Sequence, residues 1–145
     1  MPDILHDFPI QSPIQRVFEI LVSPEGLDAW WTRESGGTPA LGAEYRFWFG
    51  PEYDWRGVVS AFERPARIEW RMTVADADWL GTRVGFRLSP GAEAGTTQVE
   101  FRHLGWPERN AHYRISCFCW AMYLRLLRRY LERGEVVPYD NRLDV

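Results

Sequence analysis

The stretch that decides the fold is Tyr113-Arg-Ile-Ser-Cys-Phe-Cys-Trp-Ala-Met-Tyr-Leu-Arg-Leu-Leu-Arg-Arg-Tyr-Leu-Glu-Arg-Gly134. Its apolar side chains recur at steps of four and three residues, at Tyr113, Cys117, Trp120, Leu124, Leu127 and Leu131. This spacing stacks side chains on one face of a helix. No Pro interrupts the pattern, and Gly134 stands where a helix C-cap is expected. The stretch therefore predicts one helix over residues 108–133, roughly 39 Å long.

The segments before this helix have a period of two. Apolar or inward-facing residues alternate with polar ones at Tyr45, Phe47, Phe49, then Trp55, Gly57, Val59, Ala61, then Ile68, Trp70, Met72, Val74, then Thr82, Val84, Phe86, Leu88, and finally Thr97, Val99, Phe101, His103. Such alternation predicts an antiparallel sheet with one face in water and one face buried. An earlier strand is expected over Ile4–Ile10, at an edge of the sheet because Pro9 cannot donate to a central ladder.

Two short helices are expected between that first strand and the rest of the sheet. Ser12-Pro13-Ile14-Gln15 has the pattern of a capping box, and Ser23-Pro24 starts a second helix. The Gly- and Pro-containing residues 35–39 are expected to form a loop. The order β-α-α-β-β-β-β-β-α predicts a single α+β domain over residues 1–145, with one curved antiparallel sheet wrapped around a long C-terminal helix.

The composition excludes several classes of function. A net charge of −3 does not favour nucleic-acid binding. All 17 basic residues are Arg, which excludes Schiff-base chemistry on Lys and a P-loop, and which we interpret as the codon bias of a GC-rich bacterial genome. No signal peptide and no membrane-spanning segment is expected, which indicates a cytoplasmic protein. Cys117 and Cys119 point in nearly opposite directions on a helix, so neither a disulfide between them, a metal site nor any cofactor is expected.

A set of motifs spans most of the chain. They are Phe18 with Pro24-Glu25-Gly26-Leu27 and Trp30-Trp31, Gly42 before Tyr45-Arg-Phe, Gly57-Val58-Val59, Pro65-Ala-Arg-Ile-Glu-Trp70, His103-Leu-Gly-Trp-Pro107, and Cys119-Trp120-Ala-Met-Tyr-Leu124 with Leu127 and Tyr130-Leu131. Their order and spacing resemble the helix-grip fold of the START-like (SRPBCC) superfamily, and within it the Hsp90 ATPase activator (Aha-type) family. The resemblance implies a helix-grip domain, but its superfamily has many functions. Cys119 departs from the family's usual Gly before the helix Trp, which adds bulk there.

The candidate site is the aromatic lining between the sheet and the long helix. The predicted ligand-binding residues are Trp30, Trp31, Phe47, Phe49, Trp70, Met72, Phe86, Phe101, His103, Tyr113, Cys117 and Trp120. These residues either fill the gap as a core or line a cavity, because cores and pockets share this composition. The cavity is expected to be lined by Trp70, Phe86, Phe101 and Trp120, with His103 at one end.

Three functions follow from these alternatives. The first is binding of a small apolar or amphipathic ligand, oriented by His103 or Tyr113. The second is a cyclase- or hydrolase-type enzyme with His103 as acid or base. The third is a chaperone-interacting module that acts through its surface, as the family resemblance implies.

A second apolar stripe lies on the long helix, at Ile115, Phe118, Cys119, Met122 and Leu126. A helix that lies on a sheet with one face in water should not carry it. Either a loop or another subunit must cover this face, and a homodimer through Ile115, Phe118 and Met122 is the expected arrangement.

Overall fold

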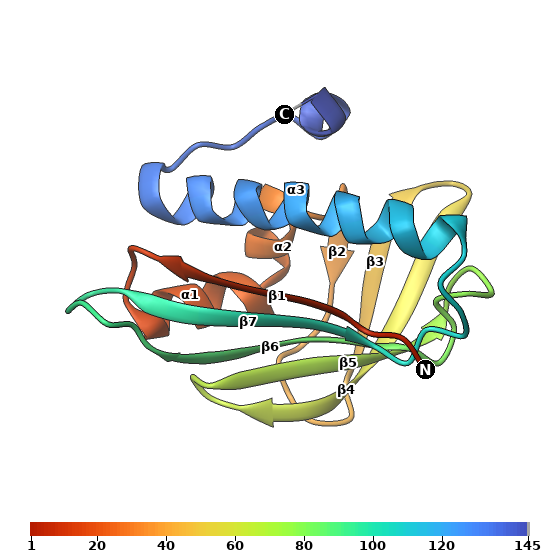
Figure 1. Ribbon diagram of the computed structural model, residues 1–145, viewed down its shortest axis with the longest axis horizontal. Helices are drawn as coiled ribbons and strands as arrows, with labels where there is room; N and C mark the ends of the chain where they lie inside the picture. Colours follow the sequence, from red (N-terminus) through yellow and green to blue (C-terminus); the bar gives the residue numbers. More distant parts are fainter. Residues whose placement is uncertain (145) are drawn as a thin grey trace.

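The computed structural model describes residues 1–144 as one antiparallel sheet with helices on one side of it (Figure 1). The elements are β1 (Ile4–Ile10), α1 (Ile14–Val22), α2 (Pro24–Trp30), β2 (Glu34–Gly36), β3 (Glu44–Gly50), β4 (Tyr53–Glu63), β5 (Arg67–Val74), β6 (Arg83–Pro90), β7 (Thr97–Leu104), α3 (Ala111–Arg133) and the 3-10 helix η1 (Tyr139–Asp144). The sheet has seven strands in the order β1-β7-β6-β5-β4-β3-β2, and α3 runs across its concave side. The predicted helix-grip fold is therefore confirmed.

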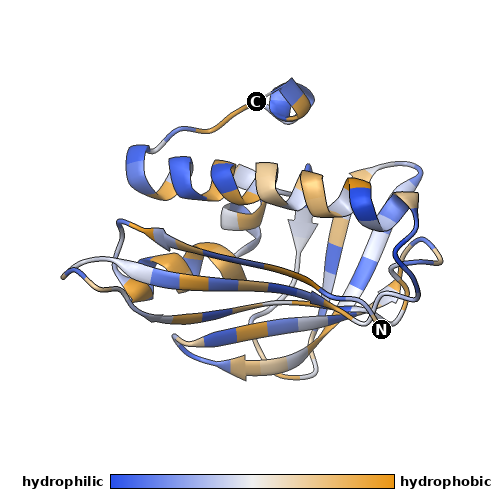
Figure 2. Cartoon of the chain, viewed as in Figure 1, coloured by the Kyte–Doolittle hydropathy of each residue, from blue (hydrophilic) through white to orange (hydrophobic). Residues whose placement is uncertain are grey.

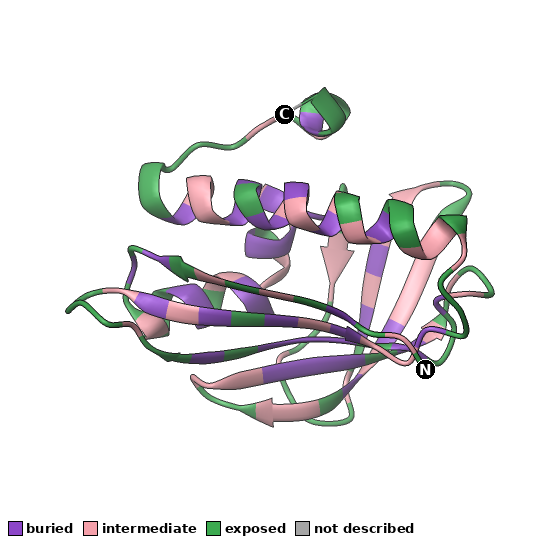
Figure 3. Cartoon of the chain, viewed as in Figure 1, coloured by how far each residue is buried: buried purple, intermediate pink, exposed green. Residues whose placement is uncertain are grey.

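The period of two in the sequence corresponds to the two faces of this sheet. In β7 the buried residues Thr97, Val99, Phe101 and His103 alternate with more exposed neighbours, as the colouring of the strands in Figure 3 illustrates. β1 pairs only with β7, so Pro9 lies on an edge strand as expected. The alternation in β7 therefore directs one row of side chains toward the helices, whereas Val74, predicted to face inward at the end of β5, is 51% exposed.

Large aromatic rings fill the space between the sheet and α3. The ring of Phe101 lies 5.3 Å from that of Phe86 and 4.5 Å from that of Trp120, measured between centroids. Gly57 on β4 makes room for two of these rings, because a Cβ at this position would come within 3.1 Å of Phe47 and 3.3 Å of Trp70. The absence of a side chain there lets the backbone approach the rings closely.

The ends of the helices are defined by capping residues, with one correction to the sequence prediction. The expected capping box at Ser12 does not form: Pro13 is the N-cap of α1, and the carbonyl oxygen of buried Ser12 accepts a hydrogen bond from Thr97. Packing against β7 thus places Ser12 in the core. Ser23 does cap α2, because its hydroxyl accepts from the backbone N–H of Gly26.

The long helix begins later than the sequence suggests. α3 starts at Ala111, where Asn110 accepts a hydrogen bond from the backbone N–H of Tyr113 at 2.9 Å. Residues 108–110 are therefore outside the helix, although its predicted end is confirmed. Gly134 is the C-cap, with a φ of 70° that only Gly adopts readily.

Two elements were not expected from the sequence. Residues 34–36 form strand β2 at the far edge of the sheet and not the beginning of a loop. In this strand Glu34 pairs with Trp48 of β3. The chain after Gly134 returns over the outer side of α3, with Val137 packed against the core, and ends in η1 (Figure 1). Both elements are short and polar, so they carry no periodic signal.

The residues of the second apolar stripe on α3 differ in their burial. Met122 and Leu126 are buried, whereas Ile115 and Phe118 are 60% and 78% exposed. The expected interface of Ile115, Phe118 and Met122 is therefore wrong in one residue, because Met122 is not on the surface. Figure 2 shows that the last turns of α3 are mostly hydrophilic. In residues 1–144, no helix combines the length and apolar character that a membrane crossing requires.

Candidate functional site

An aromatic pocket opens beside α3, at the end of the sheet that carries the turn between β3 and β4. It has a volume of about 310 Å³. Its lining residues come from the C-cap of α2, β3, β4, the loop before β6, α3 and η1. They are Trp31, Phe49, Tyr53, Trp55, Trp79, His112, Ile115, Ser116, Cys119, Trp120, Tyr123 and Tyr139. We call this space the aromatic pocket.

Four indole rings in mutual contact build the inner wall of the aromatic pocket. The ring centroid of Trp120 lies 5.1 Å from that of Trp31 and 5.8 Å from that of Trp79. Trp79 in turn lies 4.7 Å from Trp55. Because each ring supports the next, the wall is preorganised.

His103 lies beneath this wall in a chain of hydrogen bonds. The indole N–H of Trp120 donates to Nδ1 of His103 at 3.0 Å, and Nε2 of His103 lies 2.9 Å from Oγ1 of Thr82. The hydroxyl of Thr82 donates to the carbonyl oxygen of Trp79 at 2.6 Å. Since indole only donates, Nδ1 must accept, and the proton of the neutral ring is on Nε2 and bonds to Thr82.

The environment of His103 keeps its ring neutral. Its side chain has no exposed surface. Burial, and then repulsion from His112, lowers the pKa of His103 from 6.5 to about 3. Both ring nitrogens are already bonded, so His103 has no lone pair or N–H for a ligand or substrate. It orients Trp120 and thereby acts as a positioning residue for the pocket wall.

The loop that carries Trp79 is fastened to the start of α3. One carboxylate oxygen of Asp78 lies 3.2 Å from the amide nitrogen of Asn110 and 3.2 Å from Nδ1 of His112. Asn110 thus caps α3 with its oxygen and holds this loop with its amide group. The two contacts fix the distance between the loop and the helix, and with it the width of the pocket.

The outer wall is supplied by η1, which is held in place by Arg142. Only 3% of Arg142 is exposed, and its guanidinium donates to the carbonyl oxygens of Asp28, Thr32 and Val137. Next to it, Arg33 lies over the ring of Tyr139, at 4.5 Å from the centroid, and pairs with Asp140. These contacts join η1 to the end of α2 and place Tyr139 at the pocket.

Two tyrosine hydroxyl groups and one thiol of the pocket are neutral at physiological pH. Burial raises the pKa of Tyr123 to about 12, and it also raises the pKa values of Tyr139 and Cys119. Within residues 1–144, the hydroxyl groups of Tyr123 and Tyr139 have no hydrogen-bond partner, so they remain free to bond a ligand. The pocket can therefore offer hydroxyl groups to a bound molecule without offering a full charge.

The structure divides the predicted ligand-binding residues into two groups. Trp31, Phe49 and Trp120 line the aromatic pocket. The others lie in the core or elsewhere: Trp30, Phe47, Trp70, Met72, Phe86, Phe101 and His103 are at most 2% exposed. Half-buried Cys117 faces His6, and half-buried Tyr113 donates its hydroxyl to the carbonyl oxygen of Asp3. The expected cavity walls at Trp70, Phe86 and Phe101 are thus packed core, and the pocket lies closer to the surface.

Several pocket residues were missed from the sequence. Trp79 lies in a loop and Tyr139 in the C-terminal segment, where no periodicity indicates which way a side chain points. Tyr123 is on α3, one turn from Cys119 and outside the predicted stripes. The sequence does contain a signal for Tyr53 and Trp55, because both stand at the start of β4, just after the turn that follows Phe49. In the described part of the chain, no three His, Cys, Asp or Glu side chains converge on a possible metal position.

Comparison with known proteins gives the family. The sequence model of the family described as Activator of Hsp90 ATPase homolog 1-like protein matches residues 11–132. The chain belongs to this family. The resemblance inferred from the motifs is therefore confirmed. Cys119, the residue that departs from the expected motif, lies in the lining of the aromatic pocket.

Solved structures agree with this assignment. The Aha1 dimer from Colwellia psychrerythraea is similar with a TM-score of 0.82 at 25% identity, covering 93% of this chain and 99% of that one. A protein of Staphylococcus saprophyticus (TM-score 0.77, 20% identity, 94% and 96% covered) and one of Mesorhizobium loti (TM-score 0.76, 20% identity, 93% and 100% covered) share the fold. Among proteins of curated function, none matches the sequence.

Proposed function

We propose that this protein binds a small, neutral, largely apolar molecule in the aromatic pocket. The observation that carries the proposal is the preorganised wall of Trp31, Trp55, Trp79 and Trp120, which faces an open space of about 310 Å³. This volume is at the lower end of small-molecule sites. Filling it would remove apolar surface from water at about 25 cal/mol per Å².

The lining also indicates the chemistry of the ligand. Among the described lining residues none is Asp, Glu or Arg, and His112 is the one basic group. Because His112 is already bonded to Asp78, a charged ligand would lose its hydration without gaining a free counter-charge, which is costly. The hydroxyl groups of Tyr123 and Tyr139 suit a carbonyl or hydroxyl group on the ligand. A ring-bearing amphipathic molecule therefore fits best.

A matched pair of variants tests this proposal. Cys119→Phe puts a ring into the pocket, whereas Cys117→Phe makes the same change on the same helix, beside His6. The probe is N-phenyl-1-naphthylamine, an uncharged apolar fluorophore that accepts energy from tryptophan. We expect Cys119→Phe to weaken probe binding by about tenfold or more, and Cys117→Phe to leave it within about twofold, because only the first occupies the pocket. Equal affinities for both variants would contradict a site at this position.

Binding is favoured over acid–base catalysis by the surroundings of His103. An acid or base must come within hydrogen-bond reach of the substrate. His103 is fully buried, and Trp120 and Thr82 occupy its two nitrogens. The enzyme alternative that relies on His103 therefore lacks support in this arrangement.

We also propose that two copies associate through the exposed side of α3 around Ile115 and Phe118. The support is their 60% and 78% exposure and the existence of a dimeric relative at 25% identity. Phe118→Glu should make the protein monomeric in sedimentation velocity. Leu5→Glu, at a 57% exposed position on β1, is the control and should leave association unchanged. An unmodified protein that is already monomeric at tens of micromolar would refute this interface.

A second candidate function is suggested by the family match, whose description names activation of the Hsp90 ATPase. We propose that the chain contacts an Hsp90-type chaperone through its surface. The test is the ATPase rate of a purified bacterial Hsp90-type chaperone with and without this protein. A rise in rate that Cys119→Phe leaves unchanged supports a surface contact independent of the pocket. An unchanged rate at saturating protein contradicts it.

A further inference from the structure

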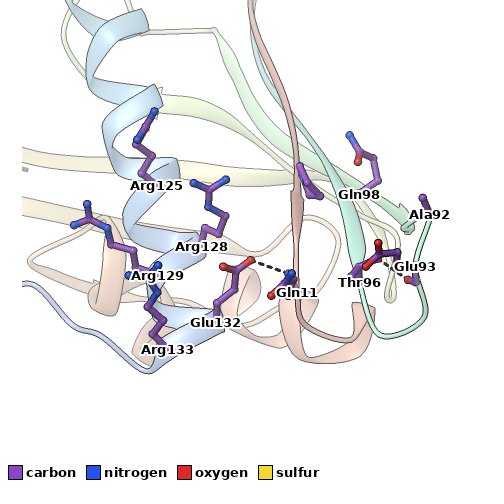
Figure 4. A pocket seen from close by; sticks show the side chains of 11 residues that line it. Gln11, Ala92, Glu93, Thr96, Gln98, Arg125, Arg128, Arg129, Glu132 and Arg133 are labelled. Atoms are coloured by element: carbon purple, nitrogen blue, oxygen red, sulfur yellow. Dashed lines mark hydrogen bonds between the residues drawn. The ribbon is translucent and has the colours of Figure 1, made fainter.

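A second concave surface lies at the opposite end of α3, away from the aromatic pocket. It is an open groove of about 730 Å³ between the last turns of α3 on one side and the end of β1 with the β6–β7 turn on the other (Figure 4). Arg125, Arg128, Arg129 and Arg133 form its helical side. We call it the arginine groove. Neither the proposed ligand pocket nor the proposed dimer contact uses it.

The positive charge of the arginine groove is only partly neutralised within the chain. Arg129 lies 3.8 Å from the carboxylate of Glu135. In residues 1–144, no acidic side chain pairs with Arg125, Arg128 or Arg133. The position of Arg133 is explained by the helix dipole, because its negative end stabilises a cation within the last turn. Arg125 and Arg128 lie earlier in α3 and have no such explanation, which is notable in a protein of net charge −3.

The chain itself places one carboxylate in this groove. Oε2 of Glu132 accepts a hydrogen bond from the backbone N–H of Gln11 at 2.9 Å, as the dashed line in Figure 4 shows. Gln11 directly follows the edge strand β1. The contact shows that a carboxylate from the helical side of the groove can reach a backbone donor on the strand side.

We propose that the arginine groove binds an acidic, extended segment of a partner protein. Arg125 and Arg133 are eight residues apart on the helix, or about 12 Å at 1.5 Å per residue. Carboxylates four residues apart in an extended peptide are about 13 Å apart, which matches this span. The planar guanidinium group pairs with carboxylates in a bidentate manner.

The acidic residues of the groove argue against a compact polyphosphate as the partner. Glu93 and Glu132 lie among the lining residues. They would repel a small anion that concentrates several charges at one point, whereas single carboxylates spaced along a peptide can each approach an arginine. The groove therefore suits separated charges better than clustered ones.

Fluorescence anisotropy at low salt tests the proposal. The probe is an end-capped octapeptide of Gly, Ser and Thr with Glu at its second and sixth positions, labelled with an uncharged fluorophore. The double variant Arg125→Gln/Arg133→Gln should weaken its binding by about tenfold, because the two charge-assisted contacts that match the spacing of its Glu residues are lost. The control Arg71→Gln/Arg87→Gln removes the same charge from exposed positions on the outer face of the sheet and should change binding by about twofold or less.

A variant that is expected to strengthen peptide binding complements this test. Glu132→Gln removes the repelling carboxylate and should tighten peptide binding by about two- to threefold, as expected for unit charges about 8 Å apart in water. Equal weakening by the two arginine double variants, or equal binding of a peptide with Gln in place of Glu, would overturn the proposal. So would displacement of the probe by inorganic tripolyphosphate at a lower concentration than by unlabelled peptide. Circular dichroism confirms that each variant is folded.

Discussion

Acidification should destabilise this protein through one buried side chain, His103. The unfolded chain binds a proton at this residue below about pH 6.5, whereas the folded protein does so only near pH 3. Between these values the unfolded state holds more protons, so the free energy of unfolding falls as the pH falls. Above the unfolded pKa, His103 does not lower the free energy of unfolding. Below it, the loss grows until the pH reaches the folded pKa.

The size of the effect follows from the two pKa values. One pKa unit corresponds to about 1.4 kcal/mol, so protonation of His103 should lower the free energy of unfolding by about 1 kcal/mol near pH 5.5 and by about 3 kcal/mol near pH 4.5. Other groups also titrate in this range. The pKa of Asp54, for example, is lowered by its hydrogen bond to Arg46. These other groups contribute equally to the pH dependence of the unmodified protein and of a variant that differs only at His103.

The variant His103→Gln isolates the effect. Gln keeps one acceptor and one donor for Trp120 and Thr82 but does not titrate. Urea unfolding followed by tryptophan fluorescence gives the free energy of unfolding of both proteins at several pH values. Between neutral pH and about pH 4.5, we expect the free energy of unfolding of the unmodified protein to fall by about 3 kcal/mol more than that of His103→Gln. A difference that stays constant over this range would refute the buried, neutral state of His103.

Two further predictions concern the parts that hold the aromatic pocket together. Asn110→Ala removes the cap of α3 and should lower the free energy of unfolding by about 1 kcal/mol or more in chemical denaturation. Asn110→Asp keeps the capping oxygen but loses the donor to Asp78 and places a second carboxylate beside it, so it should recover only part of that loss. Arg142→Gln removes most of the bonds from η1 to α2, so amide exchange over residues 135–144 should accelerate while exchange in β5 and β6 stays unchanged. Unchanged exchange in that segment would mean that Arg142 does not hold η1.

The sequence by itself determined the sheet, its buried face and the helix across it. Alternation of the kind seen from Ile68 to Met72 depends only on the geometry of a strand, and the four-three spacing from Tyr113 to Leu131 depends only on that of a helix. The motifs likewise identified the family that the comparison confirmed. These features are local, so they can be read along the chain.

The division between core and pocket was decided by the tertiary structure alone. Periodicity showed that Phe101 and Trp120 face inward, but not that their rings meet at 4.5 Å and leave no cavity between them. The open space lies instead where Trp79 and Tyr139, from a loop and from the C-terminal segment, meet α3. Their directions depend on contacts between residues far apart in the chain, such as Arg142 with Asp28, and no local pattern encodes such contacts. Periodicity likewise could not show that Met122 is buried whereas Phe118, one turn earlier on α3, is exposed.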